Sequence, residues 1–275
     1  MARLVRVDAE LVRRGLARSR QHAAELIAAG HVLLDGAPVG KPARQVDPAQ
    51  ALRVVAPAGE EYVSRGAHKL AGALDTLGPL APPVAGRRAL DAGASTGGFT
   101  DVLLRRGAAH VVAVDVGYGQ LAWSLQQDPR VTVLDRTNVR TLDPAAVAPP
   151  PALVVSDLSF ISLTLVLPAL AAAAAPDADF LLMVKPQFEV GREGIGKGGV
   201  VRDPARHAQA VRSVADAAAA LGLHTFAVVP SPLPGPSGNV EYFIGLRRDP
   251  DRAHPPEELD AVIADAIDRR PAVGP

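Results

Sequence analysis

Residues 89–101, ALDAGASTGGFTD, restrict the fold of this chain more than any other part of its sequence. The segment begins with apolar residues suited to a buried strand, continues through an aspartate and a glycine-rich turn, and then takes up a helical pattern. A strand, a tight turn and a helix in this order are typical of α/β domains that hold an adenosine-containing ligand at the strand end. We therefore expect an α/β domain with a ligand site at this turn.

The glycine spacing separates two classes of ligand. Dinucleotide sites use G-x-G-x-x-G so that backbone amides can approach a pyrophosphate, whereas Gly93 is followed only by Gly97 and Gly98. Asp115 ends the next apolar run, HVVAVD, where a carboxylate can accept hydrogen bonds from both ribose hydroxyls. The pattern favours S-adenosylmethionine, and a structural turn without a ligand is the alternative. The residues expected to contact the cofactor are Asp91, Gly93, Ser95, Thr96, Gly97, Gly98, Asp115, Asp135, Asn138 and Asp157, although Asp135 and Asn138 suit turn formation nearly as well.

Helical and strand patterns alternate from Gly66 onward, which predicts a doubly wound parallel sheet. The last two strand patterns are joined by SPLPGPSGN, which is too short and too rich in proline and glycine for a crossover helix, so these strands should pair antiparallel. The predicted fold class is α/β, with a doubly wound, seven-stranded Rossmann-like sheet in residues 66–248 that resembles the common methyltransferase fold. Its strands are expected near Ala89, Val111, Val131, Leu153, Phe180, Phe226 and Val240.

The first 58 residues differ from the rest in pattern and in charge. Two helices are predicted, one with apolar positions from Val7 to Leu16 and one from Ser19 to Ala29, followed by the strand patterns HVLLDG and LRVVAP. The segment holds nine Arg and Lys against five Asp and Glu, and guanidinium groups bind phosphates strongly. We expect a small α+β RNA-binding domain, with a structural cap as the alternative. The candidate RNA-binding residues are Arg13, Arg14, Arg18, Arg20 and, beyond this domain, Arg65.

Composition and the remaining segments limit the class of protein. The absence of cysteine excludes disulfides and thiolate metal sites, and we predict no metal site. The longest apolar tract, residues 161–176, contains Pro168 and is shorter than the roughly 20 residues of a membrane helix. Because the N-terminus also lacks a signal-peptide pattern, we expect a cytoplasmic protein with no membrane partner.

Residues 59–65 are predicted to be a linker. The acidic tail 249–275 is expected either to be mobile or to pack as an extra helix.

Four charged residues are expected to meet at one edge of the sheet. Asp157 and Lys185 each follow a parallel strand, Glu241 precedes the reversed strand, and Lys69 lies early in the helix before the first strand. These positions share the edge where open α/β sheets bind ligands. The chain has four lysines against twenty-five arginines, and only lysine can lose its proton to become a base. The pattern predicts a catalytic group of these four residues, with edge salt bridges as the alternative.

The order Lys, Asp, Lys, Glu after DAGASTGG resembles the catalytic tetrad of ribose 2′-O-methyltransferases of the RrmJ type. The segment RVDAELVRRGLARSRQHAAELIAAGHVLLDG resembles the S4 RNA-binding domain, and SRGAHKL, SDLSFISL, VKPQFEVG and NVEYF complete a resemblance to the TlyA family over residues 1–248. The resemblance implies methyl transfer from S-adenosylmethionine to cytidine 2′-hydroxyls in 23S and also 16S rRNA within ribosomal subunits. It also implies an influence on susceptibility to capreomycin-class antibiotics.

The chemistry of this reaction gives each tetrad member a role. A 2′-hydroxyl is a poor nucleophile until a general base accepts its proton, and Lys185 is the candidate base. Asp157 is expected to orient Lys185 and to lie near the positive sulfonium. Lys69 is expected to stabilise developing negative charge on oxygen, and Glu241 to hold a lysine or the ribose. SDLSF lacks the two prolines with which base-amino methyltransferases clamp an exocyclic amine.

Other functions stay open at the level of sequence. A non-catalytic rRNA-binding protein would be expected to lose the cofactor turn or the tetrad, and this chain keeps both. A membrane-active haemolysin would need an apolar or amphipathic membrane element. The loop 186–203 contains five glycines and is expected to be either a basic lid over RNA or an ordinary disordered loop. The sequence does not fix the oligomeric state, and we expect a monomer.

Overall fold

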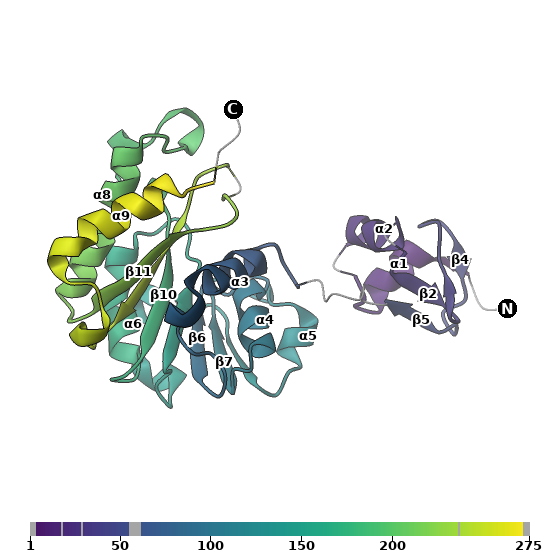
Figure 1. Ribbon diagram of the computed structural model, residues 1–275. Helices are drawn as coiled ribbons and strands as arrows, with labels where there is room; N and C mark the ends of the chain where they lie inside the picture. The colour runs from purple at the N-terminus through teal and green to yellow at the C-terminus, as the bar shows by residue number, and fades with distance from the viewer. Residues whose placement is uncertain (1–3, 18, 29, 55–61, 236, 272–275) are drawn as a thin grey trace. The chain divides into compact units, whose positions relative to one another are not determined.

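The computed structural model describes residues 4–17, 19–28, 30–54, 62–235 and 237–271, in two compact units, Met1–Glu61 and Tyr62–Pro275 (Figure 1). Of the linker predicted at 59–65, residues 59–61 lie outside the described part of the chain. The rest packs on the larger unit, because the Tyr62 ring lies 4.6 Å from the Arg105 guanidinium and the Val63 amide donates to Asp101 at 2.9 Å. Residues 62–65 therefore belong to the larger unit.

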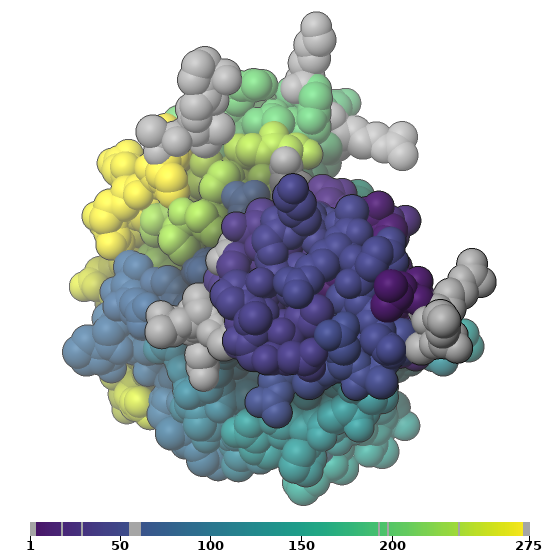
Figure 2. Space-filling model, turned by 90° about the vertical axis from the view of Figure 1, so that its right-hand side faces the viewer, coloured from purple at the N-terminus to yellow at the C-terminus, as the bar shows by residue number. Residues whose placement is uncertain are grey.

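The smaller unit contains the two predicted helices and the predicted strands. Ser19 caps the second helix, since its Oγ accepts a hydrogen bond from the His22 amide at 3.1 Å. Val7, Leu11 and Ile27 are buried in its core, and Figure 2 shows the surface of this unit in purple. Its elements are β1 (Val5–Arg6), α1 (Val7–Arg13), α2 (Arg20–Ala28), β2 (Val32–Leu34), β3 (Ala37–Pro38), β4 (Gln45–Val46) and β5 (Leu52–Val54).

The larger unit is built on one seven-stranded sheet with the order β11-β12-β10-β9-β6-β7-β8. Its strands are β6 (Arg88–Ala92), β7 (His110–Val114), β8 (Val131–Leu134), β9 (Leu153–Ser156), β10 (Asp179–Val184), β11 (His224–Pro230) and β12 (Tyr242–Arg247). Its helices are α3 (Gly66–Leu77), α4 (Gly98–Arg105), α5 (Trp123–Gln126), α6 (Leu163–Ala173), α7 (Pro186–Glu189), α8 (Pro204–Ala219) and α9 (Leu259–Asp268). Short 3₁₀ turns cover Gly78–Leu80, Val139–Thr141, Pro144–Val147, Arg192–Gly194, Lys197–Gly199, Pro250–Arg252 and Pro256–Glu258.

The direction of the strands confirms the predicted topology. β12 is antiparallel to both of its neighbours, β10 and β11, while β10, β9, β6, β7 and β8 run parallel. The reversed strand lies between β10 and β11 rather than at the margin of the sheet. Because Tyr242 at the start of β12 stands opposite Val184 at the end of β10, the residues just outside these positions, Glu241 and Lys185, come to the same edge.

Helices cover both faces of the sheet (Figure 1). One hydrophobic core joins the sheet to α3, α4 and α5, and the other joins it to α6, α8 and α9. Strands buried on both faces carry continuous apolar runs, as in β10, where all six residues are buried. The apolar tract containing Pro168 forms α6 in this second core. Within the described ranges, no helix combines the length and the apolar character needed to span a bilayer.

The acidic tail forms an additional helix within its described part. Ile263 and Ile267 of α9 are buried in the core that contains α8. The backbone before this helix is attached to the sheet, because the His254 amide donates to the Thr225 carbonyl at 2.8 Å. The tail was expected either to be mobile or to pack as an extra helix. Residues 259–268 form a packed helix, as the second expectation holds.

Candidate active site at the sheet edge

Two adjoining cavities open at the carboxyl edge of the parallel strands. The first, the tetrad cavity, has a volume of about 370 Å³ and is lined by residues that include Lys69, Asp157 and Lys185. The second, the Asp115 cavity, has a volume of about 450 Å³. Both are lined by Gly93, Ser95, Asp157 and Ser159, so they are two parts of one cleft.

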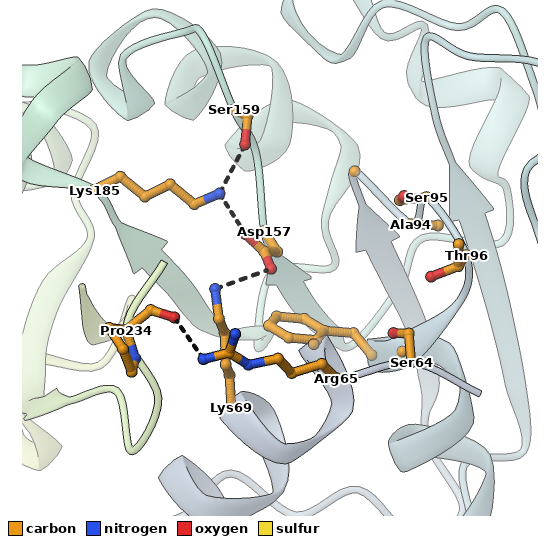
Figure 3. A pocket seen from close by; sticks show the side chains of 14 residues that line it. Ser64, Arg65, Lys69, Ala94, Ser95, Thr96, Asp157, Ser159, Lys185 and Pro234 are labelled. Carbon is orange, nitrogen blue, oxygen red and sulfur yellow. Dashed lines mark hydrogen bonds and ion pairs between the residues drawn. The ribbon is translucent and has the colours of Figure 1, made fainter. Parts of the chain in front are cut away.

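The four charged residues expected at this edge lie in one connected network. Lys69 Nζ lies 2.5 Å from Glu241 Oε2 and 3.9 Å from Asp157 Oδ2. Lys185 Nζ lies 2.6 Å from Asp157 Oδ1 and donates to Ser159 Oγ at 2.8 Å. Figure 3 shows Lys69, Asp157, Lys185 and Ser159 converging in this way. We call Lys69, Asp157, Lys185 and Glu241 the tetrad.

The network is largely removed from water, and its formal charges cancel. The lysine side chains are 8% exposed, Glu241 is 1% exposed and Asp157 is 22% exposed. Each ammonium is therefore held by at least one carboxylate, as a buried charge requires. Asp157 is the most exposed member and contacts both lysines, so it is the carboxylate of the network that faces the cleft.

Close backbone contacts bring the elements of the network together. A Cβ on Gly98, at the start of α4, would lie 2.7 Å from the Ala67 amide nitrogen, so only glycine allows α4 to approach the first turn of α3. A Cβ on Gly235 would lie 2.6 Å from Glu241 Oε1, so a side chain at this position would displace the carboxylate. These contacts hold Lys69 and Glu241 at the sheet edge.

The Asp115 cavity has the features of a nucleoside site. Asp115 Oδ1 accepts from the Gly117 amide at 2.7 Å and Oδ2 from the Ser95 amide at 2.8 Å, which fixes the carboxylate and leaves a further lone pair on each oxygen. Neighbouring apolar residues supply a wall for a planar base. These are Val116, Val139, Leu158, Phe160, Ile161 and Val166.

The predicted cofactor residues divide into those that line the cleft and those that do not. The cleft is lined by Gly93, Ser95, Thr96, Gly98, Asp115, Asn138 and Asp157. Gly97 instead caps α4 in a left-handed conformation, with φ of 97°. Asp135 accepts from the Gly119 amide at 2.8 Å and holds that turn. Asp91 belongs to the interior of β6, is fully buried, and accepts from Thr100 Oγ1 at 2.7 Å.

The environment of Asp91 changes its protonation. Burial raises the pKa of its carboxyl to about 7, while the hydrogen bonds from Thr100 act in the opposite direction. Near neutral pH this side chain therefore exchanges between its neutral and charged forms. Its bond with Thr100 joins β6 to the first turn of α4.

Sequence reasoning did not single out several residues that line the cleft. Ser64 and Ser159 line the cleft and lie within the quoted motifs SRGAHKL and SDLSFISL, which also contain Lys69 and Asp157. Phe160 is 91% exposed and has a left-handed backbone with φ of 63°. Their proximity to Lys69 and Asp157 in the sequence is the signal that could have identified them.

The candidate RNA-binding arginines differ in their surroundings. Arg14 donates to buried Glu10 and to the carbonyls of Gln50 and Pro48, so it supports the fold of the smaller unit. The hydrogen bond from the Arg13 guanidinium is the main cause that lowers the pKa of the Glu10 carboxyl to about 2. The hydrogen bond from Arg14 acts in the same direction. Arg13 and Arg20 are about 60% exposed, with Arg20 bonded to Asp8 at 3.1 Å. Arg18 lies outside the described residues, and Arg65 lines the tetrad cavity.

Comparison with known proteins agrees with this architecture. Residues 62–248 match the model of the FtsJ-like methyltransferase family, and residues 5–51 match the S4 domain. The chain is 61% identical to the 16S/23S rRNA (cytidine-2′-O)-methyltransferase TlyA of Mycobacterium tuberculosis, over 98% of this chain and 100% of that protein. It is 34% identical to hemolysin A of Brachyspira hyodysenteriae, over 87% of this chain and 98% of the relative. A hemolysin-named structure from Streptococcus thermophilus is 37% identical, covers 97% of this chain and 96% of its own, and has a TM-score of 0.69.

Proposed function

Because the chain belongs to the TlyA family, in which an S4 domain is joined to an FtsJ-like methyltransferase domain, we propose that it methylates the 2′-hydroxyl of cytidine in ribosomal RNA. The methyl donor is S-adenosylmethionine, and the substrates are 23S and also 16S rRNA within ribosomal subunits. A substrate of this kind implies a cytoplasmic enzyme. The relative from M. tuberculosis, named for activity on both rRNAs, supports this assignment.

The tetrad carries the proposal. Lys69, Asp157, Lys185 and Glu241 come from four separate elements and meet within hydrogen-bonding or ion-pair distance beside a cavity. A structural salt bridge at the sheet edge would need only one pair. A connected group that lines a cleft favours a catalytic role.

The residues of the Asp115 cavity fit S-adenosylmethionine. Asp115 can accept hydrogen bonds from both ribose hydroxyls, and the apolar wall around Val139 and Ile161 suits adenine. Asn138 lines the same cavity and can contact the base. Gly93 and Ser95 line both this cavity and the tetrad cavity, so the two cavities meet at these residues. When bound, the cofactor supplies an electrophilic methyl group on a positively charged sulfur.

The tetrad residues would activate the acceptor hydroxyl. Lys185, in its neutral form, would accept the proton of the 2′-hydroxyl and become an ammonium as the oxygen takes the methyl group. The carbon–sulfur bond of the bound donor would break in the same step, and its electron pair would stay on the sulfur, which would become neutral. Asp157 orients Lys185 and offers negative charge near the sulfonium. Lys69, held by Glu241, stabilises the negative charge that develops on the acceptor oxygen. In-line alignment of the reacting atoms supplies further rate enhancement.

Exposed groups beside the cleft suit a nucleic-acid substrate. Phe160 is 91% exposed and lines the cleft, and aromatic side chains stack on unpaired bases. Arg65 lines the tetrad cavity beside Lys69 and can bind a phosphate. In the S4 domain, Arg13 and Arg20 expose their guanidinium groups. We assign these residues to rRNA binding.

Transfer of labelled methyl from S-adenosylmethionine to isolated ribosomal subunits tests the proposal. Wild type and Lys185→Ala are compared on each subunit, and the modified nucleoside is identified after digestion. We expect labelled 2′-O-methylcytidine with the wild type and its loss with Lys185→Ala. Cofactor binding without label on either subunit would contradict the proposed substrate and favour a non-catalytic rRNA-binding role. Lysis of red cells by the purified protein is the separate assay for the activity that the hemolysin-named relatives suggest.

A further inference from the structure

Glu189 joins two segments that each carry a member of the tetrad. It ends α7, the single turn that directly follows Lys185. Its Oε1 accepts from the Leu163 amide at 2.8 Å, and its Oε2 accepts from Ser162 Oγ at 2.5 Å. Ser162 ends the loop that begins with Asp157 after β9, and Leu163 begins α6. The carboxylate therefore fixes the loop after β9 to the segment after β10.

The same loop makes two further contacts with the segment after β10. Lys185 Nζ donates to Ser159 Oγ at 2.8 Å, and the Phe160 and Phe188 rings lie 5.3 Å apart. Phe160 has a left-handed backbone, which a residue other than glycine keeps only when its surroundings enforce it. The loop thus depends on contacts outside itself for the conformation that brings Ser159 to Lys185.

Helix capping alone does not account for the position of Glu189. Ser162 already caps α6, since its Oγ accepts from the Thr164 amide at 3.1 Å. Burial raises the pKa of the Glu189 carboxyl, while its bonds with Ser162 and Leu163 act in the opposite direction. A carboxyl that is partly withdrawn from water is costly unless its hydrogen bonds are satisfied. Those of Glu189 are made to Ser162 and Leu163, next to the loop that carries Asp157. Among the described residues that line the two cavities, Glu189 does not occur.

We propose that Glu189 is a positioning residue that sets the geometry of Lys185 relative to Asp157 and Ser159, and thereby the rate of methyl transfer. The inference rests on the proposed function and deepens it. Glu189 acts through the loop 157–162 and does not touch the substrate or the cofactor. Its removal should therefore affect the chemical step more than the binding of either ligand.

Three full-length variants test this role by their kcat, their KM for ribosomal subunits, their cofactor Kd and their Tm. We expect Glu189→Ala to lower kcat at least tenfold while KM and cofactor Kd change less. Glu189→Gln should restore most of the rate, because its amide can still accept from the Leu163 amide and donate to Ser162 Oγ.

Asp203→Ala is the matched control. Asp203 caps α8 through the Ala205 amide at 2.9 Å, and no tetrad residue lies on that helix. This control variant should have a lower Tm than the wild type. At temperatures below its unfolding transition, its kcat should match that of the wild type.

The effect of Glu189→Ala is also measured in a protein that carries Ser159→Ala. This comparison distinguishes a positioning role of Glu189 from a general loss of stability. Ser159→Ala removes the bond between the loop and Lys185, so Glu189→Ala should lower kcat less in that background than in the wild type. An unchanged kcat in Glu189→Ala, or the same fold-loss in both backgrounds, would overturn the positioning role while leaving the proposed function intact. A wild type that transfers no methyl group would contradict the proposed function and, with it, this inference.

Discussion

Lys69 Nζ and Glu241 Oε2 lie 2.5 Å apart although 172 residues separate them in the chain. The pair joins the first turn of α3 to the residue before β12 and is buried, with side-chain exposures of 8% and 1%. Asp157 is the second carboxylate near this lysine, at 3.9 Å. Glu241 is therefore the nearer of the two carboxylates that hold Lys69 at the cleft.

Removal of Glu241 should destabilise the protein and disturb the tetrad. Breaking one side of a buried ion pair costs about 3–5 kcal/mol, so Glu241→Ala should lower the free energy of unfolding by that order. Glu241→Gln should lose less, because its amide oxygen still accepts from Lys69. Denaturant unfolding of both variants checks this, and equal stability of Glu241→Ala and wild type would contradict it.

The Lys185→Arg variant tests whether Lys185 acts as a general base or only as a fixed positive charge. Arginine keeps the charge beside Asp157 but does not lose its proton in a protein. We expect methyl transfer to fall about 10²- to 10⁴-fold, the usual contribution of a general base. Cofactor binding, measured by calorimetry, should stay close to that of the wild type. Substantial activity in Lys185→Arg would exclude Lys185 as the base.

Asp115→Asn should weaken cofactor binding. A hydrogen bond to a charged group contributes about 1.5–3 kcal/mol, so we expect Kd for S-adenosylmethionine to rise about tenfold or more. Asp128→Asn is a suitable control, because Asp128 pairs with Arg130 outside the cleft. If both variants bound the cofactor equally well, Asp115 would not be the ribose acceptor.

The buried carboxyl of Asp91 should make stability depend on pH. Its pKa is raised from 3.8 to about 7, so between these values the folded protein holds a proton that the unfolded chain releases. This contribution to stability is present at low pH and is lost as pH rises through the folded pKa, at about 1.4 kcal/mol per pKa unit. Asp91→Asn cannot ionise, so its stability relative to the wild type should increase from pH 5 to pH 8. Denaturant unfolding at both pH values measures this difference, and a constant difference would contradict the raised pKa.

Arg14 and Arg20 should affect different properties of the S4 domain. Arg14→Ala removes bonds to Glu10, Gln50 and Pro48 and should lower Tm. Arg20→Ala removes an exposed guanidinium and should weaken rRNA binding, with a decrease of about 1 in the slope of log affinity against log salt. Thermal unfolding and binding at several salt concentrations distinguish the two. An unchanged salt slope in Arg20→Ala would exclude a phosphate contact.

The elements of the larger unit were predictable because each strand shows its own apolar run. The proline- and glycine-rich connection SPLPGPSGN predicted the antiparallel pairing of the last two strands, which the structure confirms. The position of β12 between β10 and β11 was not predictable in this way. Strand order depends on packing between segments far apart in the chain, whereas strand direction here followed from one short connection.

The sequence by itself determined which residues would stand at the ligand edge, because strand ends are local features and parallel strands end on one side. Asp157, Lys185, Glu241 and Lys69 were found in this way. Only the tertiary structure decided what each charged side chain contacts. Asp91 belongs to the interior of β6 and bonds to Thr100, Arg14 donates to the Gln50 and Pro48 carbonyls, and Glu189 accepts from Ser162 and Leu163. Such partners are set by long-range packing and burial, which a periodic pattern of apolar residues does not encode.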